Sequence, residues 1–332
     1  MTGETWSGVK CTNKVIAGLL FVCLSLTLTG CVGSSYRAPY DYNTKLSAFA
    51  FDTANSSDAA RPFARDLCVI GSDNLTGSTE LNSVTAAGLF DVKSCGTLYA
   101  KNVHNQLAPA SLTKIMTALL ALKYGHLDDV ITASANVNIT EPGAQLAGLK
   151  EGDKLTLDQA LHALLMYSGN DASVAIAEYI SGSTDEFCNL MNREALELGA
   201  TNTHFANPHG LSQDDHYTTA YDLYLIFNAA MKYDKFKEII GMTEYTTTYS
   251  DKDGKQKEMN VRNSNYYITG DASAPSNVSV IGGKTGTTNK AGSCLILLSN
   301  DQKGNPYISV ILKAEDRDTL YGQMSKLLGQ VP

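Results

Sequence analysis

The 332-residue sequence has few charged residues, few cysteines and no excess of positive charge. Lys and Arg number 26 against 34 Asp and Glu, and this formal net charge of −8 excludes a nucleic-acid-binding protein that works through bulk positive charge. Seven Cys are too few for a disulfide scaffold, and an apolar content of 43% excludes a disordered chain. The composition therefore predicts a slightly acidic globular protein of one large domain or two smaller ones.

The N-terminus has the pattern of an export signal. Lys10 and Lys14 lie at the start of an apolar run over residues 15–28, which is too short to span a bilayer. The run ends in Leu-Thr-Gly-Cys31, which resembles the lipobox of bacterial lipoproteins. This resemblance implies that residues 1–30 are a signal peptide and that Cys31 is lipidated. An ordinary cleaved signal and an uncleaved N-terminal helix are the alternatives.

The rest of the chain divides into a polar segment and one domain. Residues 31–62 lack a periodic apolar pattern, and we expect them to form a flexible tether. Over residues 63–330 we expect an α/β (α+β) catalytic domain with an antiparallel sheet built from both ends and a helical subdomain inserted at about residues 130–240. Apolar periodicity predicts strands at 67–70, 86–92, 97–100, 244–249, 256–262, 278–281, 294–298 and 307–312, and helices at 115–122, 156–180, 184–198, 221–232 and 318–328.

The cysteines and histidines give no metal-binding pattern. Cysteine pairs with C-x-x-C spacing are absent from the sequence, and no two histidines have H-x-x-x-H spacing. Export permits disulfides, and Cys68–Cys95 is the favoured pair because both residues lie in the N-terminal strand region.

The first of three candidate motifs is Ser111-Leu-Thr-Lys114, which opens an apolar helical run. Its spacing puts Lys114 one helical turn from the hydroxyl of Ser111, whose backbone N–H faces any oxyanion formed there. The apolar surroundings disfavour the charged form of Lys114, so that a neutral amine can accept the serine proton. The alternative is an N-capping serine beside a lysine that reaches solvent, and Ser7 to Lys10 has the same pattern by chance.

The second motif is Ser168-Gly-Asn170, which closes an apolar run. A hydroxyl and an amide two residues apart at a helix–loop junction can share one pocket, where the hydroxyl relays protons and the amide holds a peptide carbonyl. The tripeptide alone is weak evidence, since Ser72-Asp-Asn74 fits the same pattern.

The third motif is Gly-Gly-Lys284-Thr-Gly286-Thr-Thr. Lys284 can offer a cation to the anionic end of a substrate, and Gly286 allows a ligand to lie against a strand. The alternative is a glycine-flanked turn with a surface lysine. A phosphate-binding loop fits poorly, because Val278 stands where that motif needs a glycine.

The three motifs occur in the order S-x-x-K, S-x-N and K-T-G, and about residues 63–328 resemble the serine D-alanyl-D-alanine carboxypeptidases, the low-molecular-mass penicillin-binding proteins. The resemblance includes the segments 205–211, 216–223 and 263–265. It implies a β-lactamase/DD-peptidase-like fold and an enzyme that removes the terminal D-alanine from peptidoglycan stem peptides. It also implies β-lactam inhibitors and no metal or cofactor.

The resemblance implies roles for the motif residues. We expect Ser111 to form the acyl-enzyme, Lys114 to act as its base, and Ser168 to relay the proton to the leaving amine. The backbone N–H groups of Ser111 and Thr287 would form the oxyanion hole. The residues expected to bind substrate are Asn170, Lys284, Thr285, Gly286 and Thr287.

Four further residues are not assigned to the chemistry. Asn207, His209 and His216 belong to the family pattern but are interpreted as turn and helix-entry residues. Arg317 is displaced from the family position of a carboxylate-binding arginine and receives no role.

Two alternative functions stay open. A class A-like β-lactamase needs a carboxylate that activates water, whereas Glu194 lies inside a helical pattern. A lipid-anchored peptidoglycan-binding protein without catalysis would use the same fold. Together with the lipobox, the resemblance predicts an extracytoplasmic protein that is lipid-anchored to the membrane and faces the cell wall, without a nucleic-acid partner.

Overall fold

The computed structural model describes residue 64, residues 66–75 and residues 80–332. These residues belong to one compact unit, Pro62–Pro332. The predicted signal peptide, Cys31 and the tether lie outside the described residues. None of the helices in the described part combines the length and the apolar character that a membrane span needs.

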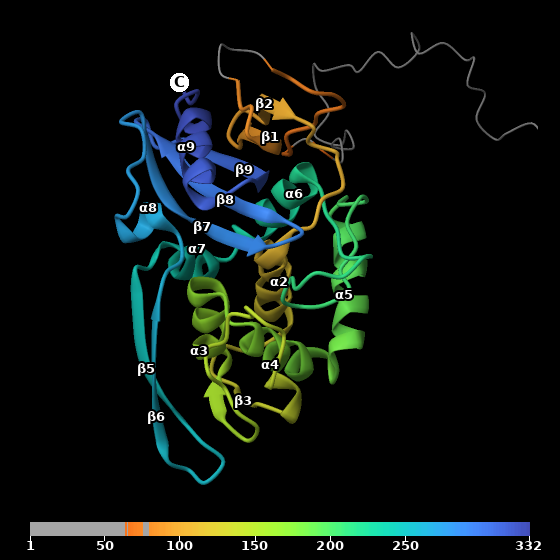
Figure 1. The fold of residues 1–332 in the computed structure, drawn as a ribbon, viewed down its shortest axis with the longest axis vertical. Coiled ribbons are helices and arrows are strands. Elements are labelled where there is room, and N and C mark those ends of the chain that lie inside the picture. Colours follow the sequence, from red (N-terminus) through yellow and green to blue (C-terminus); the bar gives the residue numbers. More distant parts are fainter. Residues whose placement is uncertain (1–63, 65, 76–79) are drawn as a thin grey trace, which may run out of the picture. The chain divides into compact units, whose positions relative to one another are not determined.

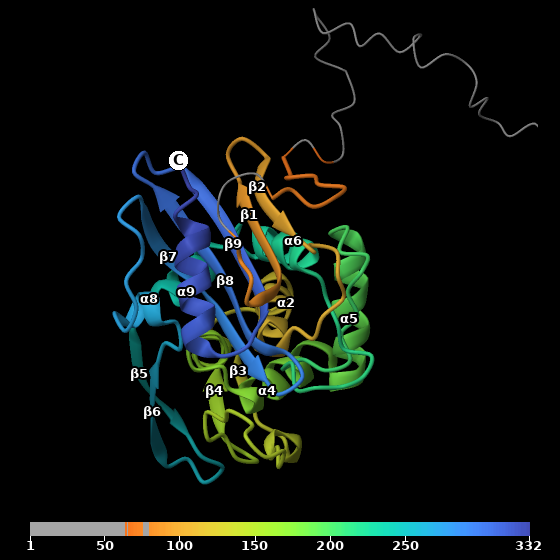
Figure 2. The same ribbon diagram turned by 45° about the horizontal axis from the view of Figure 1, so that its top comes forward.

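A five-stranded antiparallel sheet organises the described unit (Figures 1 and 2). Its strand order is β2-β1-β9-β8-β7, so that strands from both ends of the domain pair at β1 and β9. This arrangement confirms the predicted antiparallel sheet and leaves β7 at one edge. The strands are β1 (Val84–Asp91), β2 (Gly96–Lys101), β7 (Val278–Thr288), β8 (Gly292–Asp301) and β9 (Pro306–Ala314).

Helices cover both faces of this sheet, which explains the continuous apolar run over residues 294–298 in the central strand β8. On β8, Leu295 and Leu297 pack in one apolar cluster with helix α9 (Arg317–Leu328), whereas Ile296 and Leu298 belong to the other, larger cluster. Successive side chains of a strand point to opposite faces, so a continuous apolar run indicates a strand that is buried on both sides.

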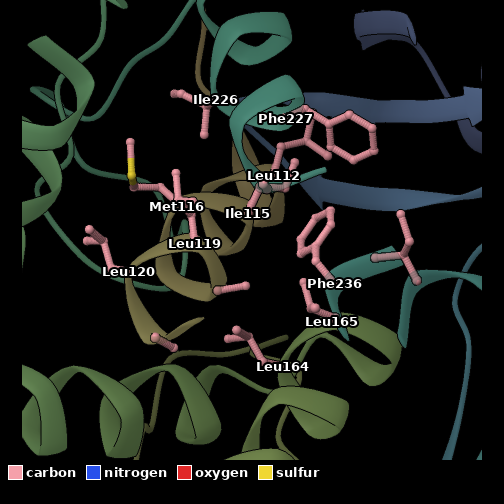
Figure 3. Packing of buried hydrophobic residues seen from close by; sticks show 14 of the residues in the cluster. Leu112, Ile115, Met116, Leu119, Leu120, Leu164, Leu165, Ile226, Phe227 and Phe236 are labelled. Carbon is pink, nitrogen blue, oxygen red and sulfur yellow. The ribbon is translucent and has the colours of Figure 1, made fainter. Parts of the chain in front are cut away.

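Helix α2 (Lys114–Tyr124) runs through the centre of the larger cluster. Its residues from Lys114 to Ala121 are all buried, and Figure 3 shows its apolar side chains facing those of α6 (Ala220–Ala230), α7 (Asp234–Gly241) and the segment Ala163–Tyr167. A helix surrounded by apolar side chains on all sides provides little water for a polar group. The only charged side chain of its buried part is therefore placed in a dry environment.

The helical segments before and after the first two motifs differ from the sequence prediction. Ser111 lies in a short 3₁₀ turn, η2 (Ala110–Thr113), and not in α2 itself. The pattern predicted as one helix over 156–180 contains α3 (Leu157–His162), a π-helical turn η4 (Ala163–Tyr167) and α4 (Asn170–Ser181). The helices separate because Ser168 adopts a left-handed backbone with φ 71°, which no α-helix continues.

A second sheet has the order β3-β4-β5-β6. The predicted hairpin of β5 and β6 is confirmed, whereas the short strands β3 and β4 and helix α7 were not predicted. The helical subdomain predicted at about 130–240 contains α3 to α7 together with β3 and β4. The remaining elements are β3 (Val130–Thr132), η3 (Ala135–Val137), β4 (Lys154–Thr156), α5 (Thr184–Glu197), β5 (Glu244–Ser250), β6 (Gln256–Arg262) and α8 (Tyr266–Thr269).

Two expectations for the N-terminal part of the domain are wrong in this structure. Residues 67–70 form no strand, because the backbone of Cys68 bonds to the hydroxyl groups of Tyr224 and Tyr221 on α6. The expected Cys68–Cys95 disulfide is not formed, and all four cysteines in the described residues are free thiols. The Cys68 thiol instead donates to the Asp91 carbonyl at 3.4 Å, and its burial raises its pKa to about 11.

Candidate active site

Ser111 and Lys114 form a hydrogen-bonded pair at the start of α2. The Nζ atom of Lys114 lies 2.9 Å from the Oγ atom of Ser111. The Lys114 side chain is fully buried, and this burial lowers its pKa well below 10.5, with the nearby charge of Lys284 as a second cause. A lowered pKa leaves a neutral amine beside the hydroxyl, and such an amine can accept its proton.

Distant parts of the chain hold Lys114 in place. Its Nζ atom donates to Oδ1 of Asn170 at 2.6 Å and to the backbone carbonyl of His209 at 2.6 Å. These acceptors come from the start of α4 and from the loop before α6, so that three segments converge on one amine. The contacts fix its position while the apolar environment disfavours its charge.

Ser168 and Lys284 form a second hydrogen-bonded pair. Lys284 on β7 is buried and donates from Nζ to Oγ of Ser168 at 3.0 Å and to the carbonyl of Thr285 at 3.0 Å. Burial lowers the pKa of Lys284 to about 7. The left-handed backbone of Ser168 turns the chain out of η4, and its hydroxyl thereby reaches this lysine.

Asp171 anchors the wall of the cleft next to Asn170. Its carboxylate accepts hydrogen bonds from the backbone N–H groups of Ala147, Gly148 and Leu149 at 2.8–3.0 Å. The backbone N–H of Asn170 donates to the carbonyl of Gln145. These bonds fasten residues 145–149 to the first turn of α4, and Asn170 is thereby held with its amide at the cleft.

Strand β7 passes directly against the nucleophile. A Cβ atom on Gly286 would lie 2.9 Å from the backbone nitrogen of Ser111, which is closer than real Cβ contacts. Only glycine allows the strand this approach. The hydroxyl of the preceding Thr285 is 2.6 Å from that of Ser264, and Thr287 is exposed toward the cleft.

The motif residues line one cleft of about 900 Å³. The structure brings together Ser111, Ser168, Asn170 and residues 285–287 as lining residues, with Lys114 and Lys284 bonded to two of them. The sequence analysis assigned no role to several other lining residues, among them Glu141, Arg262, Ser264, Tyr266 and Arg317.

Two arginines add positive charge to this cleft. Arg317, which received no role from the sequence, donates to the hydroxyl of Tyr266 at 3.0 Å and lies over its ring at 5.1 Å. Arg262 pairs with Asp271 at 3.2 Å. Asp271 offsets the charge of Arg262, whereas Arg317 and the protonated form of Lys284 provide positive charge that suits a carboxylate.

The segment around Asn207 packs against the residue before Ser111. This contact fits the interpretation of Asn207, His209 and His216 as turn and helix-entry residues. Oδ1 of Asn207 accepts from the N–H of Gly210, where a Cβ atom would lie 1.9 Å from the Ala110 carbonyl. His216 accepts from the N–H of Ala206 at Nδ1, so its Nε2 donates to Thr113 at 2.7 Å. Burial lowers the pKa of His216 to about 4 and keeps it neutral.

The carboxylate that a class A-like β-lactamase would require is not supplied by Glu194. This residue is buried on α5 and pairs with Lys123 at 2.6 Å, and it is not among the residues that line the cleft. No group of three or more acidic, histidine or cysteine side chains that could hold a metal ion occurs in the described residues. The arrangement supplies a nucleophile, a neutral amine, a second lysine–serine pair and backbone N–H donors.

Comparisons with known proteins identify the family. A family model described as D-alanyl-D-alanine carboxypeptidase matches residues 75–316. The chain is 38% identical over 239 residues to the D-alanyl-D-alanine carboxypeptidase DacF of Bacillus subtilis, covering 70% of this chain and 57% of DacF. It is 34% identical over 249 residues to DacC of Escherichia coli, covering 72% of this chain and 59% of DacC. The chain belongs to the D-alanyl-D-alanine carboxypeptidase family and spans little more than half the length of these two relatives.

Two solved structures share the fold. The Streptomyces K15 DD-transpeptidase superposes with a TM-score of 0.69 at 29% identity, covering 75% of this chain and 96% of the other. The D-alanyl-D-alanine carboxypeptidase of Mycobacterium tuberculosis H37Rv superposes with a TM-score of 0.68 at 27% identity, covering 78% and 95%. These similarities confirm the predicted DD-peptidase-like fold class.

Proposed function

We propose that the protein is a serine-type D-alanyl-D-alanine carboxypeptidase that removes the terminal D-alanine from peptidoglycan stem peptides through an acyl-enzyme on Ser111. The observation that carries this proposal is the contact of the buried Lys114 amine with the Ser111 hydroxyl, at 2.9 Å. An unprotonated lysine in that position activates a serine without a metal ion or a cofactor.

In the acylation step, Oγ of Ser111 attacks the carbonyl between the two D-alanines while its proton passes to Nζ of Lys114. The oxyanion is stabilised by the backbone N–H groups of Ser111 and Thr287. The C–N bond then breaks while the proton held by Lys114 is relayed through the hydroxyl of Ser168, which accepts a hydrogen bond from Lys284, to the leaving amine, so that Lys114 is neutral again. Water attacks the resulting ester with Lys114 again as base, which releases the shortened peptide and restores the serine.

Substrate binding is assigned to the two walls of the cleft. Asn170 holds the peptide amide, because its side chain is fixed by Lys114 and its backbone by Gln145. Lys284 and Thr285 bind the terminal carboxylate, and Gly286 lets the peptide lie along β7. Arg317 adds positive charge at the same end of the cleft.

We further propose that the protein acts outside the cytoplasm, anchored to the cell membrane by lipid on Cys31. The support is the sequence alone: a basic start, a short apolar run and a cysteine at its end. Residues 31–62 then form the tether to a catalytic domain at 63–330, which would position the cleft toward the cell wall.

A defined pentapeptide ending in D-Ala-D-Ala tests the proposed activity. The wild-type protein should release D-alanine and should be labelled covalently by a fluorescent penicillin. Ser111→Ala should lose both reactions, because the hydroxyl is the only nucleophile in the mechanism. Ser212→Ala is the matched control, since Ser212 lines the same cleft and its hydroxyl donates to that of Thr288, which has no role in the mechanism.

The products separate this function from its alternatives. Rapid hydrolysis of the penicillin without release of D-alanine would identify a β-lactamase. Peptide binding with neither reaction would identify a binding protein. Because one structural relative is described as a DD-transpeptidase, an amino-acid acceptor is added in a parallel reaction, and exchange of the terminal D-alanine for it would identify transpeptidation.

A further inference from the structure

A second hollow lies next to the catalytic cleft and contains none of the three motifs. Its volume is about 320 Å³, and Asn289 lines both this hollow and the cleft. Asn289 belongs to the turn that joins β7 to β8. The hollow is lined by residues 82–85, Asn289, Gly292 and residues 313–315.

The direction of a peptide along β7 leads to this hollow. The terminal carboxylate is assigned to Lys284 and Thr285, and the proposed mechanism assigns the scissile carbonyl to Gly286 and Thr287, where β7 passes beside Ser111. A peptide placed in this way extends its upstream part past Thr288 toward the β7–β8 turn. The path out of the cleft therefore passes Asn289.

The distance suits the upstream residues of a stem peptide. Thr288 pairs with Gly292 on β8, and Ser293 pairs with Ala314 on β9, so the part of the hollow that Ala314 and the preceding Lys313 line is two strand spacings from β7. Two spacings amount to about 10 Å, and an extended peptide covers this distance with about three residues.

Lys313 has an unusual backbone at the edge of the hollow. Its φ is 58°, and the pairing of β8 with β9 is irregular beside it, between Ser293 and Leu295. A bulge of this kind redirects a side chain, and a left-handed non-glycine residue carries strain that often accompanies a binding site. Lys313 is exposed, and no hydrogen bond or ion pair joins its side chain to any residue of the described part.

The neighbouring lysine is already engaged. Lys290 pairs with Asp214 at 3.0 Å and donates to the carbonyl of Gln213, which fastens the β7–β8 turn to the opposite loop. Lys313 is thus the cation that the hollow itself offers. Uncharged side chains make up most of its remaining lining, and Glu315 is its only acid.

We propose that this hollow is a subsite for the upstream part of the stem peptide, in which Lys313 binds a free carboxylate two to three residues before the scissile bond. A γ-linked glutamate residue carries such a carboxylate. The inference rests on the proposed function, because the direction of the peptide follows from the roles of Lys284 and Ser111.

Three peptides of different upstream chemistry test the subsite. The first is an acetylated tripeptide, Lys-D-Ala-D-Ala. The second is the pentapeptide Ala-γ-D-Glu-Lys-D-Ala-D-Ala, and the third is the same pentapeptide with the glutamate carboxylate amidated. We expect the wild-type protein to have the highest kcat/KM for the acidic pentapeptide.

Lys313→Asn removes the cation and keeps a residue that accepts a left-handed backbone. We expect kcat/KM for the acidic pentapeptide to fall about fivefold, as for an exposed charge pair, and to approach that of the amidated peptide. Tripeptide hydrolysis and penicillin labelling should stay unchanged. Lys303→Asn is the matched control, because Lys303 lies in the β8–β9 turn at the other end of β9.

Equal losses on all three peptides, or equal wild-type rates on the two pentapeptides, would overturn the subsite. The binding of the uncleaved acidic pentapeptide to Ser111→Ala and to Ser111→Ala/Lys313→Asn, measured by calorimetry, separates this result from a failure of the proposed function. Weaker binding to the double variant supports the subsite even if the wild-type protein releases no D-alanine. Unchanged binding overturns it.

Discussion

Gly286→Ala is expected to impair the nucleophile, because the added Cβ atom would lie closer to the residues around Ser111 than van der Waals contact allows. The added Cβ atom would lie 2.9 Å from the backbone nitrogen of Ser111, 3.1 Å from Cβ of Ala110 and 3.2 Å from the nitrogen of Leu112. Ordinary contacts begin at 3.4 Å, so β7 and η2 must separate by about 0.5 Å. Two of these three atoms are backbone nitrogens and the third is the Cβ atom of Ala110, so no flexible side chain can move aside.

The separation acts on the groups that the mechanism needs most. It moves the N–H of Ser111 and the neighbouring strand apart, and a misplacement of about 1 Å can cost a hundredfold in rate. For about half of that displacement we expect acylation by a fluorescent penicillin to slow about tenfold, with a loss of about 1–3 kcal/mol in the free energy of unfolding. Stopped-flow labelling measures the rate, and urea denaturation measures the stability.

Gly322→Ala is the control for the glycine change itself. Gly322 lies in α9, and a Cβ atom there would meet no atom within 4 Å. Its replacement should leave acylation unchanged and stabilise the helix by up to about 1 kcal/mol. If Gly286→Ala acylates as fast as the wild-type protein, the argument that β7 must approach the nucleophile this closely is refuted.

Four further results are expected. Lys114→Ala should slow acylation far more than it weakens peptide binding, and equal effects on both would remove Lys114 from the role of base. Because burial lowers the pKa of Lys284 to about 7, the ammonium that binds a carboxylate is lost above this pH. The kcat/KM of an acidic substrate should therefore fall above pH 7, whereas that of its C-terminal amide should not, and Lys284→Ala should abolish the difference. The pKa of His216 is lowered from 6.5 to about 4, so the unfolded chain binds more protons than the folded one between these values. His216 alone should accordingly contribute about 3 kcal/mol to the loss of stability as the pH falls through this range, with the buried His209 adding a further loss, and urea titrations should show a smaller total drop for His216→Gln. Cys31→Ala should block lipidation and leave the protein processing-defective, and mass spectrometry of its N-terminus should find the signal still attached; a lipid-bearing variant, or one that still enters the detergent phase after its signal has been cleaved, would contradict the lipoprotein hypothesis.

The sequence was sufficient to find the motifs because their chemistry is local. Ser111 and Lys114 are three residues apart, so a helical turn alone brings them together. The other acceptors of Lys114 are not local, since Asn170 and the His209 carbonyl are 56 and 95 residues away. The periodicity of apolar residues in the sequence does not predict such long-range contacts, which are seen only in the folded chain.

The missed cleft residues have the same explanation. Arg262 and Ser264 reach the cleft because β6 ends beside it, and Arg317 does so because α9 begins there. The segment 263–265 already belonged to the family pattern, and this was the signal that could have identified Ser264 as a neighbour of Thr285. The short strands β3 and β4 were missed because three residues are too few to show alternation.

Backbone strain at two positions shows how the fold arranges its two hydroxyl groups. Ala110, directly before Ser111, has φ 48°, and Ser168 has φ 71°, although neither residue is a glycine. Such conformations persist only where the surroundings determine them. The Ala110 carbonyl accepts from Thr113, which His216 holds in turn, and Ser168 accepts from the buried Lys284. Buried hydrogen bonds that involve the distant residues His216 and Lys284 hold the two strained positions in place. Loosening either set of bonds should therefore let the hydroxyl group of Ser111 or Ser168 move before the domain unfolds.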